Sequence, residues 1–493
     1  MFEKITPEQA GLKTQVVTEL ISLLNRRGAA THGILLMRHG KILAEHYWAP
    51  FHKDFCHRMY SQTKSFVGVA LGLLEEEGKL NLDEKIVNLF PEKIHGELHE
   101  YLKNQTVREM MTMTTAGVPS SWFRAKAHDR TEFYFSDERY MRPSGTFFDY
   151  DSAGSQVLCA LVEKLAGMPL LDYMKEKLFN RMGAFQTATV LKTPNGDSWG
   201  DSAMICTLRD MAAFGQLVMN YGTWEGERLM NEKFLRTATS KLVDNNSSAH
   251  YSIYNQGYGY QIWRIANNGF AFVGMGDQIT LCFPDKDLVF AIMSDNQGTQ
   301  LIRHIMMGYV CDEIAGKISD KPLPEDPKAQ AELEELSKTL KLRSVQGQED
   351  SPFRAELDGK TYICNENTAG ITKFSFHFKD AKSGEFHYTN AQGDKVLPFG
   401  VNHNVFGKFP QLGYSNDYGV LPTTDGFMYD DAVSLAWYED KKIMMLVQII
   451  DRYFGNMSLM FSFKGNEVSG RITKTAEDFL NEYPTVFVAK RQD

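Results

Sequence analysis

Hydrophobic residues recur at helical spacing at the start of the chain and at strand spacing soon afterwards. Residues from about 6 to 27 carry leucines and valines three and four positions apart, which predicts an amphipathic helix. Two apolar runs, 33–38 and 42–48, flank a short His-Gly-Lys turn and predict a β-hairpin. A second apolar helix is predicted from about residue 61 to 77, where a glycine follows.

The middle of the chain, from about residue 105 to 220, is predicted to be mostly helical. Strand patterns then return. They occupy residues 258–263, 270–273, 278–283 and 288–293, and a helix is predicted from about 299 to 314. Strands at both ends of a helical middle are typical of one antiparallel sheet between helical layers. We therefore predict an α+β domain over residues 1–318, with a mainly helical subdomain.

A proline-rich and charged segment, residues 321–327, predicts a boundary. One charged helix is predicted after it, from about 328 to 342, so residues 319–345 are interpreted as a linker and helix. Beyond them, short aromatic-rich segments alternate with Gly, Asn and Asp turns. That spacing predicts a small sandwich or a closed antiparallel β-barrel over residues 346–493.

The composition is that of a globular protein with enough apolar residues for a large core. Of 493 residues, 43% are hydrophobic and 23% are charged. The formal charge of −9 at pH 7, without a basic stripe, argues against a nucleic-acid partner. No apolar run is long enough to cross a membrane and no secretory signal is visible, so we expect a cytoplasmic protein. Six scattered cysteines show no metal-ligand spacing, and we expect reduced thiols, no metal and no cofactor.

The candidate chemistry is concentrated at the start of the second helix. Ser61 and Lys64 form an S-x-x-K pattern there, and their spacing places both side chains on one face of the first turn. A serine nucleophile needs a base within hydrogen-bond distance, and N–H groups that bind the developing oxyanion. A helix start supplies unpaired N–H groups. The four residues alone are more often a serine N-cap and a solvated lysine, so their interpretation depends on the neighbouring segments.

Five segments resemble successive motifs of one protein family and stand in the same order as in that family. They are Arg58–Ser65, Leu74–Asp83, Thr106–Pro119, Phe148–Ser155 and Thr207–Gly215. Over roughly residues 5–316 the chain resembles the serine β-lactamase and penicillin-binding-protein superfamily, with the closest likeness to class C β-lactamases and family VIII esterases. The resemblance implies a β-lactamase/transpeptidase-like fold, Ser61 as the acyl-accepting nucleophile, and Lys64 and Tyr150 as proton carriers. Which of Lys64 and Tyr150 is the base at each step stays open.

Two positions depart from that family pattern. Ser152 stands where the Y-x-N motif has asparagine, although serine still donates and accepts a hydrogen bond. The third motif, usually K-T-G or H-x-G, has its best candidate at Phe272-Val273-Gly274 and continues into Met275 and Gly276. The resemblance implies an oxyanion hole formed by the N–H groups of Ser61 and Met275. Because this motif carries no charged side chain, we expect weak penicillin recognition and favour the esterase and amide-hydrolase branch, which includes enzymes that cleave 6-aminohexanoate oligomers.

We therefore predict a metal-independent serine hydrolase that acts on a small-molecule ester or amide. The alternatives are a β-lactamase or D-amino-acid-specific peptidase, an acyltransferase, or a non-catalytic ligand-binding or assembly module that keeps the fold. Aromatic residues, Trp122 and Tyr258 among them, are candidates for an apolar acyl pocket, although such residues more often form a core. Similar enzymes carry lipocalin-like tails, so we hypothesise that the C-terminal domain covers the active-site mouth or mediates homo-oligomer formation.

Overall fold

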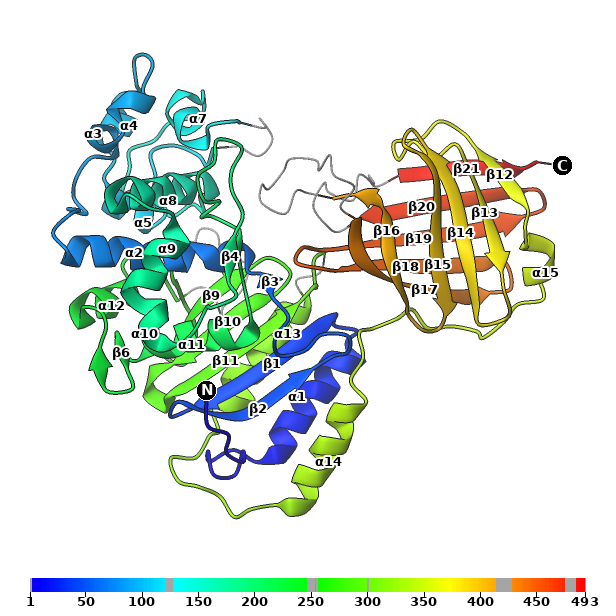
Figure 1. The fold of residues 1–493 in the computed structure, drawn as a ribbon, viewed down its shortest axis with the longest axis horizontal. Coiled ribbons are helices and arrows are strands. Elements are labelled where there is room, and N and C mark those ends of the chain that lie inside the picture. Colours follow the sequence, from blue (N-terminus) through cyan, green and yellow to red (C-terminus); the bar gives the residue numbers. More distant parts are fainter. Residues whose placement is uncertain are drawn as a thin grey trace. The chain divides into compact units, whose positions relative to one another are not determined.

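The computed structural model of this protein describes residues 2–120, 127–245, 253, 256–298, 301–413, 428–474 and 485–492. The chain divides into two compact units, the first ending at Lys341 and the second beginning at Leu342 (Figure 1). Helix α14 (Pro327–Lys338) belongs to the first unit, where Leu333 packs into the core. The boundaries that we predict from the sequence, after residues 318 and 345, stay predictions.

The first unit is built on an antiparallel sheet, as predicted. In the described part of the chain, its strand order is β2-β1-β11-β10-β9-β8. The strands are β1 (Thr31–Arg38), β2 (Lys41–Tyr47), β8 (Trp263–Arg264), β9 (Phe270–Gly274), β10 (Gln278–Phe283) and β11 (Leu288–Ser294). The predicted strand at 258–263 is wrong except for its last residue. Gln261 has a positive φ of 57°, a conformation that interrupts an extended run before β8 begins.

Helices cover both faces of this sheet because successive strand residues point to opposite sides. One face packs on helices α1 (Thr14–Arg26), α13 (Leu301–Tyr309) and α14, and this core includes Ile34, Leu281 and Phe290. On the other face, Gly215 of α11 (Leu208–Met219) lies directly against side chains of β10 and β11. Helix α1 begins at Thr14 and not near residue 6 as predicted. Glu8 precedes the helix and accepts hydrogen bonds from the N–H and the hydroxyl of Thr14, the first residue of the helix.

A mainly helical subdomain is inserted between β2 and β8, as predicted. Its helices include α2 (Thr63–Glu76), α5 (Val107–Met111), α7 (Arg130–Ser136), α8 (Ser152–Ala166), α9 (Leu170–Met174) and α12 (Glu232–Ala238); shorter ones are α3 (Ile86–Leu89), α4 (Glu100–Asn104) and α10 (Asn180–Met182). A short sheet of β3 (His57–Arg58), β5 (Met204–Cys206) and β4 (Thr189–Val190) lies beside it, with a hairpin of β6 (Thr223–Trp224) and β7 (Glu227–Arg228). Every residue of α2 from Thr63 to Leu74 is buried, so this helix is central to the subdomain.

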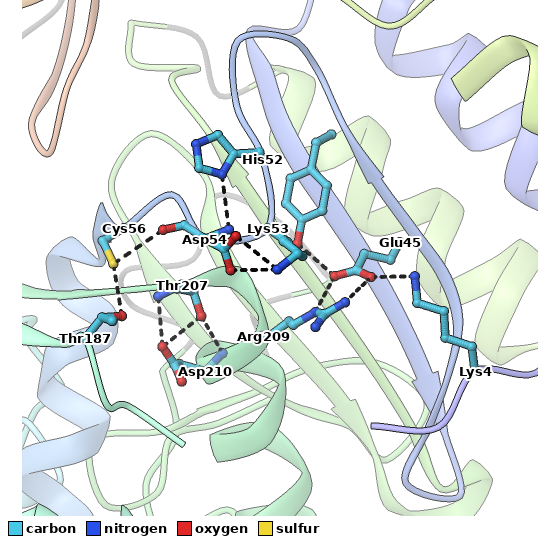
Figure 2. A network of polar contacts seen from close by, with 11 residues as sticks. Lys4, Glu45, His52, Lys53, Asp54, Cys56, Thr187, Thr207, Arg209 and Asp210 are labelled. Atoms are coloured by element: carbon cyan, nitrogen blue, oxygen red, sulfur yellow. Dashed lines mark hydrogen bonds and ion pairs between the residues drawn. The ribbon is translucent and has the colours of Figure 1, made fainter. Parts of the chain in front are cut away.

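A partly buried ion-pair network joins the sheet edge to α11 (Figure 2). Glu45 on β2 accepts hydrogen bonds from Arg209 Nε at 2.6 Å and Nη2 at 2.8 Å, and it pairs with Lys4 Nζ at 3.0 Å. Burial by itself would raise the pKa of Glu45, but the bonds from Arg209 and Lys4 outweigh burial and lower the pKa to about 2. The carboxylate therefore stays charged at neutral pH and fixes the start of α11 against β2.

The second unit is a closed β-barrel, which confirms the barrel alternative. Its strands, as far as the structure describes them, are β12 (Thr361–Cys364), β13 (Lys373–Phe378), β14 (Ser383–Asn390), β15 (Gly393–Val401), β16 (Val405–Leu412), β17 (Met428–Glu439), β18 (Lys442–Ile450), β19 (Phe454–Lys464), β20 (Glu467–Lys474) and β21 (Thr485–Arg491). All neighbours pair antiparallel except β15 and β17, whose short parallel pairing at Gly400–Ser434 and Val401–Leu435 closes the ring. Stacked and edge-on phenylalanines fill the interior, with Phe374, Phe376 and Phe461 in mutual contact.

Candidate active site

Ser61 and Lys64 lie together at the start of α2, as their spacing predicts. The Lys64 ammonium nitrogen donates to the Ser61 hydroxyl over a distance of 3.0 Å. The lysine is only 2% exposed, whereas the serine is partly exposed. Ser61 lies in a 3₁₀ turn, Tyr60–Gln62, that leads directly into α2, so the α-helix starts two residues later than the sequence predicts. The pair therefore combines a reachable hydroxyl with a buried amine.

The turn that carries Ser61 is held by contacts on both sides. Met59 N–H donates to the Met204 carbonyl of β5 at 2.7 Å. The Thr63 hydroxyl donates to the Tyr60 carbonyl at 2.7 Å and accepts from Met204 N–H at 3.1 Å. Tyr60 has a positive φ of 48°, which is uncommon for a bulky residue and persists only where the surroundings enforce it. These contacts therefore hold Ser61 on a strained, rigid turn.

Asp201 is the contact of Lys64 that sequence reasoning missed. Lys64 Nζ donates to the Asp201 backbone carbonyl at 2.6 Å, and one carboxylate oxygen, Oδ2, lies 3.9 Å from the same nitrogen. No motif signals this residue, because a backbone carbonyl is supplied by any amino acid and the two positions are 137 residues apart in sequence.

The ring of Tyr150 also lies near the lysine. Lys64 Nζ is 5.1 Å from the centroid of the Tyr150 ring, which stacks on Trp263 at 5.6 Å. Tyr258 packs with Trp263 and Phe148 in the same cluster and is buried. Burial raises the pKa of the Tyr258 hydroxyl, and the neighbouring Tyr150 adds to that rise. The structure thus brings Tyr150 to Lys64 and places Tyr258 behind it in the core; contact of Tyr258 with substrate stays a prediction.

Ser152 begins helix α8, directly after the N-cap Asp151. The Asp151 side chain accepts a hydrogen bond from Gly154 N–H at 3.0 Å, a standard N-terminal cap. Ser152 is partly exposed at the end of the segment that carries Tyr150. Its role as the counterpart of the family's asparagine stays a prediction. Trp122, the other predicted aromatic, lies outside the described residues.

The predicted third motif lies against the nucleophile turn. A Cβ atom added to Gly274 would be 2.1 Å from the carbonyl oxygen of Met59, two residues before Ser61. Gly276 has a positive φ of 74°, and Met275 between the two glycines is 41% exposed. The end of β9 and the Ser61 turn are therefore in backbone contact, a contact that only a residue without a side chain allows.

A cation that the sequence analysis did not find lies beside this strand. Arg303 of α13 donates from Nη2 to the Gly274 carbonyl at 3.2 Å and pairs through Nε with the buried Asp277 at 2.5 Å. The pair is formally neutral, so the strand end carries little net charge.

A family model described as Beta-lactamase matches residues 15–304. The chain belongs to the beta-lactamase family. This confirms the family inferred from the five segments around and beyond Ser61. The matched residues include Ser61, Lys64, Tyr150 and the Gly274 strand.

The individual proteins that this chain resembles share little sequence identity with it. The 6-aminohexanoate-dimer hydrolase of Paenarthrobacter ureafaciens is 23% identical over 249 residues, which are 47% of this chain and 63% of that protein. The match thus spans just under two thirds of that relative. Among solved structures, an octameric penicillin-binding protein homologue from Pyrococcus abyssi has a TM-score of 0.50 and 16% identity, covering 96% of this chain and 99% of its own. D-amino acid amidase from Ochrobactrum anthropi SV3 has a TM-score of 0.50 and 15% identity, covering 62% and 100%.

Within the described residues, no group of three or more His, Cys, Asp or Glu side chains is arranged to hold a metal ion. None of the helices in the described ranges combines the length and apolar character needed to cross a membrane.

Proposed function

We propose that this protein is a serine hydrolase that cleaves a small ester or amide through a covalent acyl-Ser61 intermediate. The observation that carries the proposal is the 3.0 Å hydrogen bond between Lys64 Nζ and Ser61 Oγ at the start of α2. A serine hydroxyl is a weak nucleophile until a neighbouring group accepts its proton. The family membership and the amide-hydrolysing names of two relatives agree with this chemistry.

The proposed reaction has two halves. In the first, Ser61 Oγ attacks the substrate carbonyl carbon while its proton moves to Lys64 or Tyr150, and the carbonyl oxygen becomes an oxyanion. The N–H groups of Ser61 and Met275 would donate to that oxyanion. The proton then passes to the leaving alcohol or amine as the carbon–oxygen or carbon–nitrogen bond breaks. In the second half, water attacks the acyl-serine and releases the acid; an acceptor other than water would make the enzyme an acyltransferase.

Covalent labelling tests the nucleophile without knowledge of the substrate. A fluorophosphonate probe should add one probe mass to the wild-type protein at Ser61, and the adduct should be lost in Ser61→Ala. Lys64→Ala should lose at least about 10³-fold in labelling rate, since removal of one member of a nucleophile–base pair commonly costs that much. Matched controls are Ser136→Ala, an exposed serine on α7, and Lys79→Ala, a surface lysine just past α2. A folded wild-type protein that stays unlabelled would favour the non-catalytic module.

Substrate preference is tested with two chromogenic compounds. Because neither Phe272 nor Val273 supplies a cation for a substrate carboxylate, p-nitrophenyl esters should be hydrolysed faster than nitrocefin. Rapid nitrocefin turnover without ester cleavage would instead indicate a β-lactamase.

A further inference from the structure

The end of β9 is held by one arginine of α13. Arg303 Nη2 donates to the Gly274 carbonyl oxygen at 3.2 Å, and Arg303 Nε donates to Asp277 Oδ1 at 2.5 Å. A guanidinium group is planar and carries its N–H donors in fixed directions, so one group binds both acceptors at once. The Arg303 side chain is 19% exposed and the Asp277 side chain is 2% exposed, so both bonds are largely shielded from water. Arg303 therefore ties the last residue of the strand to the loop that follows it.

Asp277 is itself anchored, so the guanidinium group of the arginine is held in a fixed place. Asp277 Oδ2 accepts from Asn296 Nδ2 at 3.0 Å, and Asn296 Oδ1 accepts from the Ala30 N–H at 2.9 Å. The loop Met275–Asp277, which joins β9 to β10, is also bound through its backbone, because the Gly276 carbonyl accepts from the Asn296 N–H at 3.1 Å. This network joins the loop to the residues that precede β1 and follow β11.

The carbonyl that Arg303 binds belongs to the same peptide group as the Met275 N–H. Because a trans peptide group is planar, its C=O and N–H point in opposite directions and cannot turn independently of each other. The hydrogen bond from Arg303 to the Gly274 carbonyl therefore also fixes the direction of the Met275 N–H. In addition, a donor on the carbonyl polarises the peptide group, which makes its N–H a stronger donor. Loss of the guanidinium group would remove both effects.

We propose that Arg303 is a positioning residue for the oxyanion hole, which holds the Gly274–Met275 peptide so that the Met275 N–H donates to the developing oxyanion of the substrate. This inference rests on the proposed serine-hydrolase function and deepens it. Donors of an oxyanion hole are effective because they are oriented before the reaction begins. Arg303 acts through the peptide group and needs no contact with the substrate, so its effect does not depend on the charge of the substrate.

The test compares the hydrolysis of p-nitrophenyl butyrate, an uncharged ester, by Arg303→Met and by the wild type. Loss of an interaction that is made only in the transition state lowers kcat and leaves KM unchanged. We expect a loss of about 10-fold in kcat, smaller than the loss of about 10²–10³-fold that follows removal of an oxyanion-hole donor itself. The rate of fluorophosphonate labelling at Ser61 should fall by a similar factor, because that attack also places negative charge on an oxygen.

A second ester separates this role from recognition of a substrate carboxylate. Mono-p-nitrophenyl succinate carries a carboxylate, and positioning by Arg303 predicts the same loss in kcat for this ester as for the butyrate. An Arg303→Met protein that hydrolyses the butyrate like wild type, but has a raised KM for the succinate, would show that Arg303 binds substrate, and it would overturn the inference. An unchanged kcat for both esters would also overturn it.

Arg209→Met is the matched control, because the side chains of the Arg209–Glu45 pair are 26% and 4% exposed, close to those of Arg303 and Asp277. It should lower the free energy of unfolding and leave kcat unchanged. If Arg303→Met does not fold because the Asp277 carboxylate stays buried without its cation, the double variant Arg303→Met/Asp277→Asn removes both charges and carries the same expected loss in kcat. A wild-type protein without labelling at Ser61 would instead overturn the hydrolase proposal.

Discussion

Replacing Gly274 by alanine tests whether β9 supplies half of the oxyanion hole. The new Cβ atom would lie 2.1 Å from the Met59 carbonyl oxygen, whereas even a close C–H···O contact needs about 3.3 Å. The strand and the Ser61 turn must therefore separate by about 1 Å. Gly274 is not in the left-handed region, so the perturbation is steric alone.

A displacement of this size should appear mainly in turnover. Misplacement of a catalytic group by about 1 Å can cost about 100-fold, which corresponds to about 2.7 kcal/mol of transition-state stabilisation. Overpacking should also reduce the free energy of unfolding by about 1–3 kcal/mol. The assay is kcat for p-nitrophenyl ester hydrolysis well below the unfolding temperature, normalised to the fraction of molecules that fluorophosphonate labels.

Gly308→Ala is the control, because a Cβ atom there has only an ordinary contact of 3.9 Å with Ile253. That helical substitution should leave kcat unchanged and slightly stabilise α13. A folded Gly274→Ala protein with wild-type kcat would refute the reasoning, since it would mean that the separation of β9 from the Ser61 turn does not affect the reacting carbonyl.

Two further predictions concern stability and pH. Burial raises the pKa of Asp431 on β17 from 3.8 to about 7, so ionisation of this carboxyl opposes folding of the barrel. Asp431→Asn should therefore add about 4 kcal/mol to the free energy of unfolding at pH 8, measured by urea titration, and the gain should shrink below pH 7 and vanish near pH 4. An equal gain at pH 4 and pH 8 would contradict this prediction. Burial lowers the pKa of His57 on β3 from 6.5 to about 3, so the buried neutral ring contributes its full stabilisation only above pH 6.5. Between pH 7 and pH 5 the contribution of His57 to the free energy of unfolding should fall by about 2 kcal/mol. His57→Phe should reduce the loss of unfolding free energy over this pH range by the same amount. An unchanged acid sensitivity in His57→Phe would mean that His57 accepts a proton without unfolding.

The sequence predicts local features of the site better than long-range ones. The contact between Ser61 and Lys64 follows from their spacing, even though the turn is 3₁₀ at Ser61. The short strand β8 could not be predicted, because the pattern of Tyr258 to Trp263 is strand-like and only the backbone shows the turn at Gln261. The contact of Asp201 with Lys64 could not be predicted either, because it depends on chain folding across the subdomain.

The strand order of the first unit also has a consequence for synthesis on the ribosome. The β1–β2 hairpin is made early, yet the other neighbour of β1 is β11, which begins only at Leu288. At about 5–20 residues per second, the apolar hairpin waits tens of seconds for that partner. During this time the nascent chain already contains Ser61 and Lys64 but lacks β9, whose end contacts the Ser61 turn. The candidate site is therefore assembled only after most of the first unit has been translated, and we expect a chain released before that point to expose the apolar hairpin and to aggregate.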